Sequence, residues 1–386
     1  MKYNSQRILV IISVLFLVAC QAKAQQELPT HKNATKETVS LYNNLKKLAA
    51  KGFMFGHQDD LAYGVNWKYN ASSGSAGRSD VKESAGDYPA VYGWELGGLE
   101  LDHPKNLDAV PFETMKQFIQ EGYERGGVIT ISWHAYSPLG NKKSAWDTTH
   151  GTVATILPGA VNHELYKSWL DKIAVFLHSL KGKKGEAIPV LFRPFHELTG
   201  SWFWWGQRQC TPEEFKALWR FTFQYMHNEK KLNNLLWVYN TSGDFSTGDE
   251  FLERYPGDDM VDMLSFDTYQ YGDSSKSNSF SEKTNHLLSI VQSIADKKNK
   301  LTALAETGYE AIPQTNWWTD VLLKAIGNNK ISYVLVWRNH GYSEGMKKMH
   351  YYAPYKGQAS ADDFRKFYQH KRTIFEKEAA KEKLYR

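Results

Sequence analysis

The chain has 386 residues, of which 42% are apolar and 23% charged, a balance that fits one large barrel or two smaller domains and excludes wholesale disorder. The net charge is +5, both signs are interspersed, and no basic run is interleaved with aromatic residues outside the C-terminal helix. Nucleic-acid binding is therefore disfavoured, and a neutral substrate is compatible with the sequence. Aromatic residues make up 14% of the chain, which indicates either filler or flat sugar-binding surfaces.

The first residues have the pattern of a targeting segment. Two cationic residues precede an apolar stretch, residues 8–18, that is too short to span a membrane stably. The stretch ends in Leu17-Val18-Ala19-Cys20, which resembles a bacterial lipobox. The pattern predicts that residues 1–19 are a signal peptide and that Cys20 is lipidated at the start of the mature chain. Ordinary cleavage after Ala24 is the alternative.

Cysteine usage limits the other kinds of site. The chain has two cysteines, so lipidation of Cys20 leaves Cys210 alone. Neither a disulfide framework nor a CxxC metal site is then possible. Residues 20–35 are polar and are expected to form a tether between the lipid and the folded domain.

Eight short apolar runs with few charges follow, as is typical of parallel strands buried on both faces. They lie near residues 53–58, 89–96, 127–133, 188–194, 235–239, 262–268, 301–306 and 333–338.

Helix signals separate these runs. Pro111 opens one helical pattern, and Thr211-Pro212-Glu213-Glu214 is a capping box with proline at the first helical position. Ser360 with Asp363 predicts the same device near the C-terminus. Residues 377–386 are charge-rich and predict a solvated helix end.

Alternation of eight strands with helices predicts an α/β fold, a (β/α)₈ TIM barrel in a single domain. This catalytic domain is expected to cover residues 36–386. A doubly wound open sheet is the alternative, but no G-x-G-x-x-G or Walker loop follows any strand.

Two glutamates close apolar runs 109 positions apart. Glu197 follows the fourth predicted strand and Glu306 ends the seventh, so both are expected on the carboxyl-terminal face of the barrel, where active sites of this fold lie. Facing carboxylates are what glycoside hydrolysis requires. Taken alone, either residue fits a helix cap or a salt-bridge partner equally well.

Several segments resemble glycoside hydrolase family 26, the β-mannanase family, over essentially the whole mature chain. The most specific are Arg193-Pro194-Phe195-His196-Glu197, the following residues 200–206, and Ala305-Glu306-Thr307-Gly308. Segments 56–58, 132–134, 266–269 and 337–339 are also similar.

The resemblance implies that Glu197 is the acid/base and Glu306 the nucleophile of a retaining mechanism. Arg193, four residues before Glu197 on the same strand, is well placed to stabilise the Glu306 anion, although a structural ion pair is the alternative. Phe195 and Trp202 are expected to provide the apolar setting that raises the pKa of Glu197. The expected substrate-binding set is His134, Trp146, Arg193, His196, Trp202, Tyr269, Trp337 and Arg338; its histidines and tryptophans are otherwise core residues.

The implied activity is that of an endo-β-1,4-mannanase acting on mannan, glucomannan, galactomannan or their oligosaccharides. The alternatives are a β-1,3-xylanase or mixed-linkage β-glucanase of the same family, or a non-catalytic glycan-binding lipoprotein. No cofactor or metal is expected, because His196-Glu197 and His163-Glu164 lack the second histidine of a zinc-protease helix. The protein is expected to be a monomer.

A lipidated Cys20 implies anchoring to a bacterial envelope membrane. Residues 21–25 contain no acidic cluster resembling a surface-export signal of bacterial lipoproteins. The sequence therefore favours a periplasm-facing anchor over the outer surface.

Overall fold

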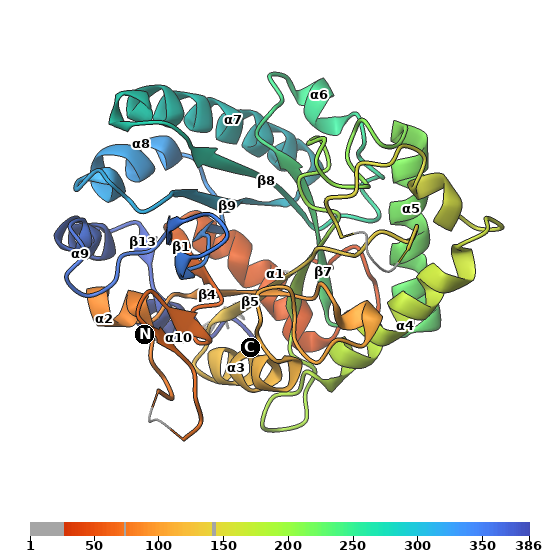
Figure 1. Ribbon diagram of the computed structural model, residues 1–386, viewed down its shortest axis with the longest axis horizontal. Helices are drawn as coiled ribbons and strands as arrows, with labels where there is room; N and C mark the ends of the chain where they lie inside the picture. Colours follow the sequence, from red (N-terminus) through yellow and green to blue (C-terminus); the bar gives the residue numbers. More distant parts are fainter. Residues whose placement is uncertain (1–26, 73–74, 141–143) are drawn as a thin grey trace, which may run out of the picture.

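The computed structural model describes residues 27–386 except 73–74 and 141–143, and a closed parallel barrel lies at its centre (Figure 1). Pairing of the last barrel strand with the first closes the sheet. The predicted single-domain (β/α)₈ barrel is thus confirmed, and the open sheet is excluded. The barrel strands, in order, are β1 (Phe53–Gln58), β4 (Val91–Glu95), β5 (Val128–Trp133), β6 (Val190–Pro194), β7 (Leu235–Ser242), β8 (Met263–Gln270), β9 (Leu301–Tyr309) and β10 (Tyr333–Val336).

Helices surround this barrel, and in the described part of the chain none has the length and apolar character needed to cross a bilayer. The α-helices are α1 (Lys36–Ala49), α2 (Asp80–Ala85), α3 (Phe112–Glu124), α4 (His163–Ser179), α5 (Pro212–Gln224), α6 (Gly248–Leu252), α7 (Ser277–Lys298), α8 (Leu323–Ile326), α9 (Ala361–Gln369) and α10 (Glu376–Lys381). Short strands form the hairpins β2 (Tyr63–Gly64) with β3 (Trp67–Lys68) and β11 (Gly341–Ser343) with β12 (Lys348–His350), and β13 (Thr373–Ile374) pairs with β1.

All eight predicted strands are present. The largest differences are at the carboxyl ends of β7, β8 and β9, which extend beyond the predicted ranges. These extensions contain polar residues such as Asn240 and Thr307, whose backbone groups continue the parallel pairing. Apolar runs therefore located the strands but underestimated their polar ends.

The helix signals were confirmed at two places and wrong at a third. Pro111 caps α3, and Thr211 forms the predicted capping box with Glu214, through N–H···O bonds of 3.2 and 2.8 Å. Ser360 precedes α9 but makes no capping bond. Its hydroxyl instead donates to Gln358 and accepts from the Trp318 indole, so the second capping box does not form.

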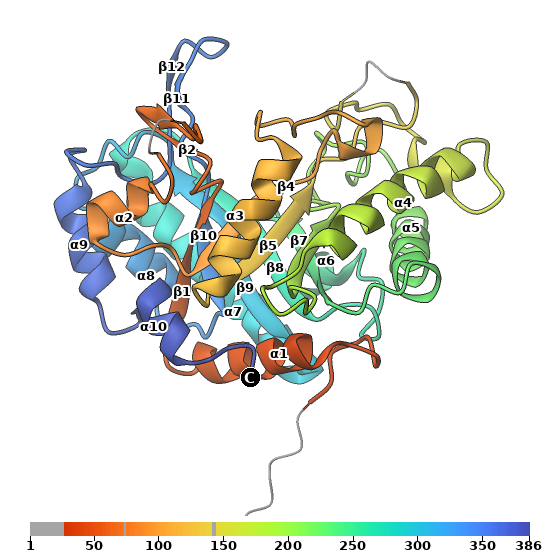
Figure 2. The same ribbon diagram turned by 90° about the horizontal axis from the view of Figure 1, so that it is seen from below.

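Helix α1 closes the amino-terminal end of the barrel. Its Leu41, Leu45 and Leu48 are buried in one cluster with strand residues such as Met54 and Val128. Figure 2 shows α1 running beneath the strands, with the C-terminus beside it. The barrel interior is therefore filled on this side.

The C-terminal residues pack on the same end, contrary to the predicted solvated helix end. Ala379 and Leu384 are buried, and the Tyr385 hydroxyl donates to the Gly127 carbonyl over 2.7 Å. Lys381 and Lys383 between them stay exposed. Residues 377–386 thus have an apolar side that packs on the barrel, which their high charge content did not indicate.

The described chain also enters at this end. Thr30 N–H donates to the Asp262 carboxylate over 2.7 Å, and Thr35 N–H donates to the Asn233 carbonyl over 2.8 Å. The described part of the predicted tether therefore packs on the barrel. Cys20 and the signal peptide lie outside the described residues.

Candidate active site

Strand ends bring the two glutamates together at the carboxyl-terminal face. Glu306 lies within β9, and Glu197 lies three residues beyond the end of β6. One carboxylate oxygen from each lies within 4.8 Å of the other, and an oxygen of Asp267 in β8 completes the group at the same spacing. A separation near 5 Å leaves no room for a water between the carboxyls and a sugar ring, which is the retaining arrangement.

Glu306 is buried and held by two donors. Arg193 in β6 forms an ion pair with one of its oxygens, and the Tyr269 hydroxyl in β8 donates to the other over 2.7 Å. Burial and the charge of Glu306 keep the pKa of Tyr269 well above its ordinary value, so the phenol remains a donor. Both contacts stabilise negative charge on Glu306 and fix its orientation.

The surroundings of Glu197 favour its protonated form. Burial, and secondly the charge of Glu306, raise the pKa of Glu197 to about 7. Its backbone has φ +52°, and Phe195 has φ +54°. Non-glycine residues rarely adopt this left-handed conformation, which costs on the order of 1 kcal/mol or more. The strained turn after β6 therefore reduces the stability of the fold and positions the Glu197 carboxyl over the barrel mouth.

The expected apolar setting of Glu197 was partly wrong. Phe195 packs in the core against Trp204 and Trp205. Trp202 does contact the carboxyl, but through an indole N–H that donates to it over 2.6 Å. This bond lowers the pKa of Glu197 and so opposes the effect of burial. Trp202 thus orients the carboxyl and moderates its acidity.

Asp267 was missed as a site residue. Both of its oxygens lie 3.3 Å from Arg193 Nη1, so a single guanidinium bridges it to Glu306. Burial and the charge of Glu306 raise the pKa of Asp267 well above its ordinary value. The three carboxyls are close enough to hold a cation, but the guanidinium already supplies positive charge there. The sequence did place Asp267 near the carboxyl end of a predicted strand, and this position could have marked it as a site residue.

A histidine pair lies beside the glutamates. Nε2 of His134, just after β5, is 3.0 Å from Nε2 of His196. Burial opposes the charged form of His134, but Glu95 bonds its Nδ1 over 2.8 Å and raises its pKa above the ordinary value. Burial, with His134 and Arg193, lowers the pKa of His196 well below the ordinary value. The two pKa values are shifted in opposite directions, so His134 is the more readily protonated ring of the pair.

Glu95 was also missed, although it carried the same sequence signal as the catalytic candidates. It is the last residue of the apolar strand β4 and is fully buried. Besides the imidazole, its carboxylate accepts the His134 N–H over 2.7 Å and the Ser132 hydroxyl over 2.6 Å. The role of this glutamate is therefore to orient a histidine of the site.

Aromatic side chains divide between the cleft and the core. Trp146 is 50% exposed and stacks on His134 at 5.2 Å between ring centroids, and Trp202 is 37% exposed. Trp337 follows β10 and is partly exposed. Trp204 and Trp205 are fully buried, so the aromatic residues just after Glu197 divide between Trp202, which reaches the cleft, and these two core residues.

Arg338 lies at a second acidic group in the barrel mouth. Its Nη1 is 2.9 Å from Asp108, which the sequence did not single out. Burial and the charge of Asp108 raise the pKa of the nearby Asp59 well above its ordinary value. The Arg338 guanidinium therefore supplies N–H donors for sugar hydroxyls in the barrel mouth, where most of the charged groups are carboxyls.

An open cleft of about 710 Å³ is lined by Glu197, Trp202, Asp267 and Tyr269. A parallel eight-stranded barrel with two carboxyls near 5 Å apart over such a cleft is typical of retaining glycoside hydrolases.

Comparison with known proteins identifies the family. The sequence profile described as glycosyl hydrolase family 26 matches residues 30–355, and the chain belongs to that family. A GH26 β-mannanase from Bacteroides ovatus is 45% identical, with a TM-score of 0.82 over 88% of this chain and 95% of that one.

Two curated relatives are named mannan endo-1,4-beta-mannosidase. One, from Bifidobacterium adolescentis, is 32% identical over 87% of this chain, and one from Thermothelomyces thermophilus is 30% identical over 73%. The chain spans 34% and 52% of the lengths of these two proteins. Their similarity therefore concerns the barrel and its site.

Proposed function

We propose that this chain is a retaining endo-β-1,4-mannanase that hydrolyses β-1,4-mannosidic bonds by double displacement. The observation that carries the mechanism is the carboxyl pair within 4.8 Å, with the pKa of Glu197 near 7 and Glu306 held by Arg193 and Tyr269. Mannan as the substrate is supported by the names of the relatives and of the structural neighbour from Bacteroides ovatus.

In the first step, Glu197 donates its proton to the glycosidic oxygen as the bond from that oxygen to the anomeric carbon breaks. Glu306 attacks the anomeric carbon and forms a covalent glycosyl ester. The charge on Glu306 is consumed in this step. Because that charge is the second cause of the raised pKa of Glu197, the pKa falls in the intermediate.

In the second step, the Glu197 carboxylate takes a proton from water, which attacks the anomeric carbon and releases Glu306. The lower pKa holds Glu197 ionised as a base at the point where a base is needed. Arg193 stays between Glu306 and Asp267 throughout and stabilises the carboxylate as it returns.

The remaining members of the site bind the sugars on either side of the scissile bond. His134 and His196 lie beside the sugar that reacts with Glu306, and His134 supports the ring of Trp146. Tyr269 orients the nucleophile. Trp146, Trp202 and Trp337 offer ring faces for stacking, and Arg338 donates to a more distant sugar. Alanine at Trp146 or Trp337 is expected to raise KM more than it lowers kcat, whereas alanine at Trp202 also removes the donor to Glu197 and should lower kcat.

Reducing-sugar release from mannan, glucomannan, galactomannan, β-1,3-xylan and mixed-linkage β-glucan tests the substrate assignment. We expect release from the three mannans, and absence of product from all of them would refute it. Release from xylan or β-glucan alone would favour the other activities of the family. Glu306→Ala is the control: activity that survives this change would belong to a contaminant.

The action on the chain is tested separately. The product profile over time on mannohexaose distinguishes cleavage at internal bonds from release of mannobiose at an end. A mixture of products from the first minutes supports endo action, whereas mannobiose as the sole early product contradicts it.

We also propose that Cys20 is acylated and anchors the protein to the bacterial envelope, facing the periplasm. The lipobox resemblance supports the anchor, and the lack of an acidic cluster after Cys20 supports the side. In that place the enzyme would trim imported manno-oligosaccharides. Cys20→Ala should move the protein from the membrane to the soluble fraction. Removal of the protein from intact cells by external protease would contradict the periplasmic side.

A further inference from the structure

Basic side chains gather at the end of the barrel where the strands begin. The loops before β6, β7, β9 and β10 supply lysines there, as do α1 and the C-terminal residues. We call the surface around six of these residues the basic face: Lys36, Lys47, Lys183, Lys184, Lys383 and Arg386, all of which are exposed.

Most of these charges are not neutralised by a carboxylate. Among the described residues, only Lys36 of the six forms an ion pair, with Glu37 at 3.6 Å and with its own side chain 90% exposed. Three carboxylates, Glu37, Glu124 and Glu186, lie among these cations and offset part of their charge. Glu124 accepts the Lys183 N–H over 2.6 Å, and Glu186 accepts the Lys184 N–H over 3.0 Å. The ammonium groups are therefore available for an external anion.

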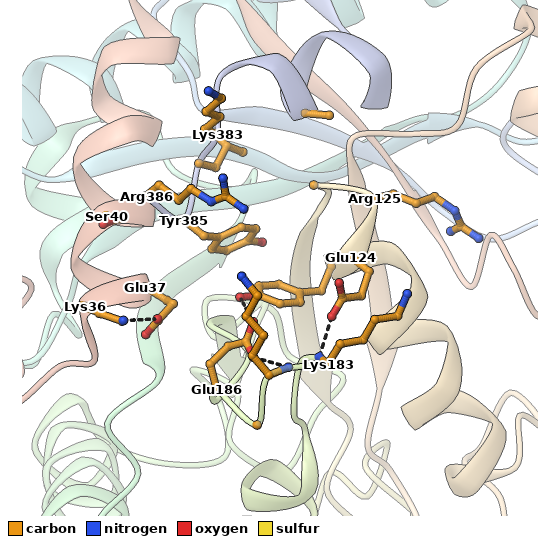
Figure 3. Close-up of a pocket in the computed structure, with 16 residues that line it drawn as sticks. Lys36, Glu37, Ser40, Glu124, Arg125, Lys183, Glu186, Lys383, Tyr385 and Arg386 are labelled. Atoms are coloured by element: carbon orange, nitrogen blue, oxygen red, sulfur yellow. Dashed lines mark hydrogen bonds and ion pairs between the residues drawn. The ribbon is translucent and has the colours of Figure 1, made fainter.

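The basic face is hollowed. A cavity of about 1100 Å³ lies between α1, the loops before β5 and β6, and the C-terminal residues. Figure 3 shows Lys36, Lys183, Lys383 and Arg386 around it. A cavity of this volume admits a phosphate-bearing headgroup between cations from three separate segments of the chain.

Acidic groups collect at the opposite end. Three carboxyls, Glu197, Asp267 and Glu306, lie there around one guanidinium, that of Arg193. The described residues carry equal numbers of each sign, because Lys2, Arg7, Lys23, Lys142 and Lys143 lie outside them. An excess of cations on the basic face is therefore matched by an excess of anions over the rest of the described residues. An anionic surface attracts the basic face and repels the cleft.

The chain enters beside the basic face. Glu27 forms an ion pair with Lys46 of α1, and Thr30 bonds to Asp262 just before β8. Residues 20–26 separate the proposed acylation site from this point, and seven residues reach about 25 Å at most. An acylated Cys20 thus holds this end of the barrel within that distance of the bilayer.

We propose that the basic face docks on a bilayer surface of anionic phospholipid, with headgroup phosphates in its cavity, and turns the catalytic cleft away from the membrane. The proposal rests on the proposed acylation of Cys20 and goes beyond it. A tether alone permits every orientation, whereas a charged docking face selects one. A cleft turned away from the bilayer remains accessible to long glycans.

The test uses the acylated protein in vesicles of phosphatidylcholine with or without phosphatidylglycerol. A donor fluorophore is attached at Asn328→Cys, before β10, or at Met346→Cys in the β11–β12 hairpin, and an acceptor is placed on the lipid headgroups. Asn328 and Met346 are exposed, and Cys210 is buried, so each label is specific. We expect stronger energy transfer from position 328 than from 346 in anionic vesicles. The difference should shrink in phosphatidylcholine alone, or at about 0.5 M salt where the Debye length is about 4 Å.

Charge reversal supplies the matched controls. Glutamate at Lys36, Lys183, Lys383 and Arg386 should abolish the difference between the two labels. Four reversals on the cleft side should preserve it: Lys68, Lys105, Arg208 and Lys347, all exposed and on segments that follow barrel strands. Equal transfer from both labels, or an equal response to both sets of reversals, would overturn the proposal.

Different measurements test the acylation, the docking and the catalytic proposal. An intact mass without acyl chains would refute the anchor, and flotation of the unacylated chain with anionic vesicles would then still test the basic face. Binding that does not depend on phosphatidylglycerol would overturn the docking. Mannohexaose hydrolysis in the same vesicles reports on the catalytic proposal independently of both results.

Discussion

Replacement of Glu197 by glutamine should stabilise the protein at alkaline pH while abolishing acid/base catalysis. Burial and the charge of Glu306 raise the pKa of Glu197 from 4.5 to about 7. Between these values the folded protein holds a proton that the unfolded chain has released. The free energy of unfolding therefore falls as pH rises through this window, and the loss is complete above pH 7.

The size of the effect follows from the pKa difference. At about 1.4 kcal/mol for each tenfold change in proton affinity, the raised pKa costs about 3 kcal/mol above pH 7. Glutamine stays neutral and can still accept the Trp202 N–H, so it avoids this cost. For a chain of this length the unfolding entropy is about 0.8 kcal/mol/K, and the variant should gain about 4 °C in Tm.

Calorimetry at about pH 4 and about pH 8 measures the gain. We expect similar Tm values for the two proteins at the lower pH and a higher Tm for Glu197→Gln at the upper one. Glu164→Gln is the control, since that side chain is 80% exposed and should change Tm little at either pH. Equal gains at both pH values, or none at about pH 8, would refute the electrostatic reasoning.

Three further predictions concern the pH profile, the nucleophile and stability. Because Glu197 must be protonated, kcat/KM on mannohexaose should decline above about pH 7. Trp202→Phe removes the indole N–H that lowers the pKa of Glu197, so this variant should move the decline to higher pH. A shift to lower pH would contradict this role of Trp202. Tyr269→Phe removes a donor to Glu306 and should lower kcat about 10- to 100-fold with Tm nearly unchanged, so full activity would exclude the contact from catalysis. Thr211→Ala breaks the capping box and should cost about 1 kcal/mol in urea unfolding without changing kcat; an unchanged midpoint would show that the cap contributes nothing.

The fold was predictable because strands buried on both faces have sequences that are apolar along their whole length. The same property located Glu197 and Glu306, since a carboxylate that ends such a run must face a cleft or a specific partner. Once the strands were counted, the barrel brought the two residues to one face. Arg193 followed from its strand position, and Tyr269 followed from the family resemblance.

Partners distant in sequence could not be predicted in this way. Asp267 shares a guanidinium with Glu306 but lies 74 positions from Arg193. Glu95 ends an apolar strand as Glu306 does, yet it bonds to a histidine and not to the cleft. Trp204 and Trp205 adjoin Trp202 in sequence, and the turn after β6 directs them into the core. Each of these outcomes depends on side-chain direction, which neighbouring residues in the sequence do not determine.

The stereochemistry of hydrolysis tests the account most directly. Proton NMR of mannohexaose cleavage, recorded before the products mutarotate, identifies which anomer forms at the new reducing end. Carboxyls within 4.8 Å of one another predict two displacements, so the β-anomer should appear first and the α-anomer only later by mutarotation. An α-anomer formed first would mean a single displacement by water and would contradict the assignment of Glu306 as nucleophile.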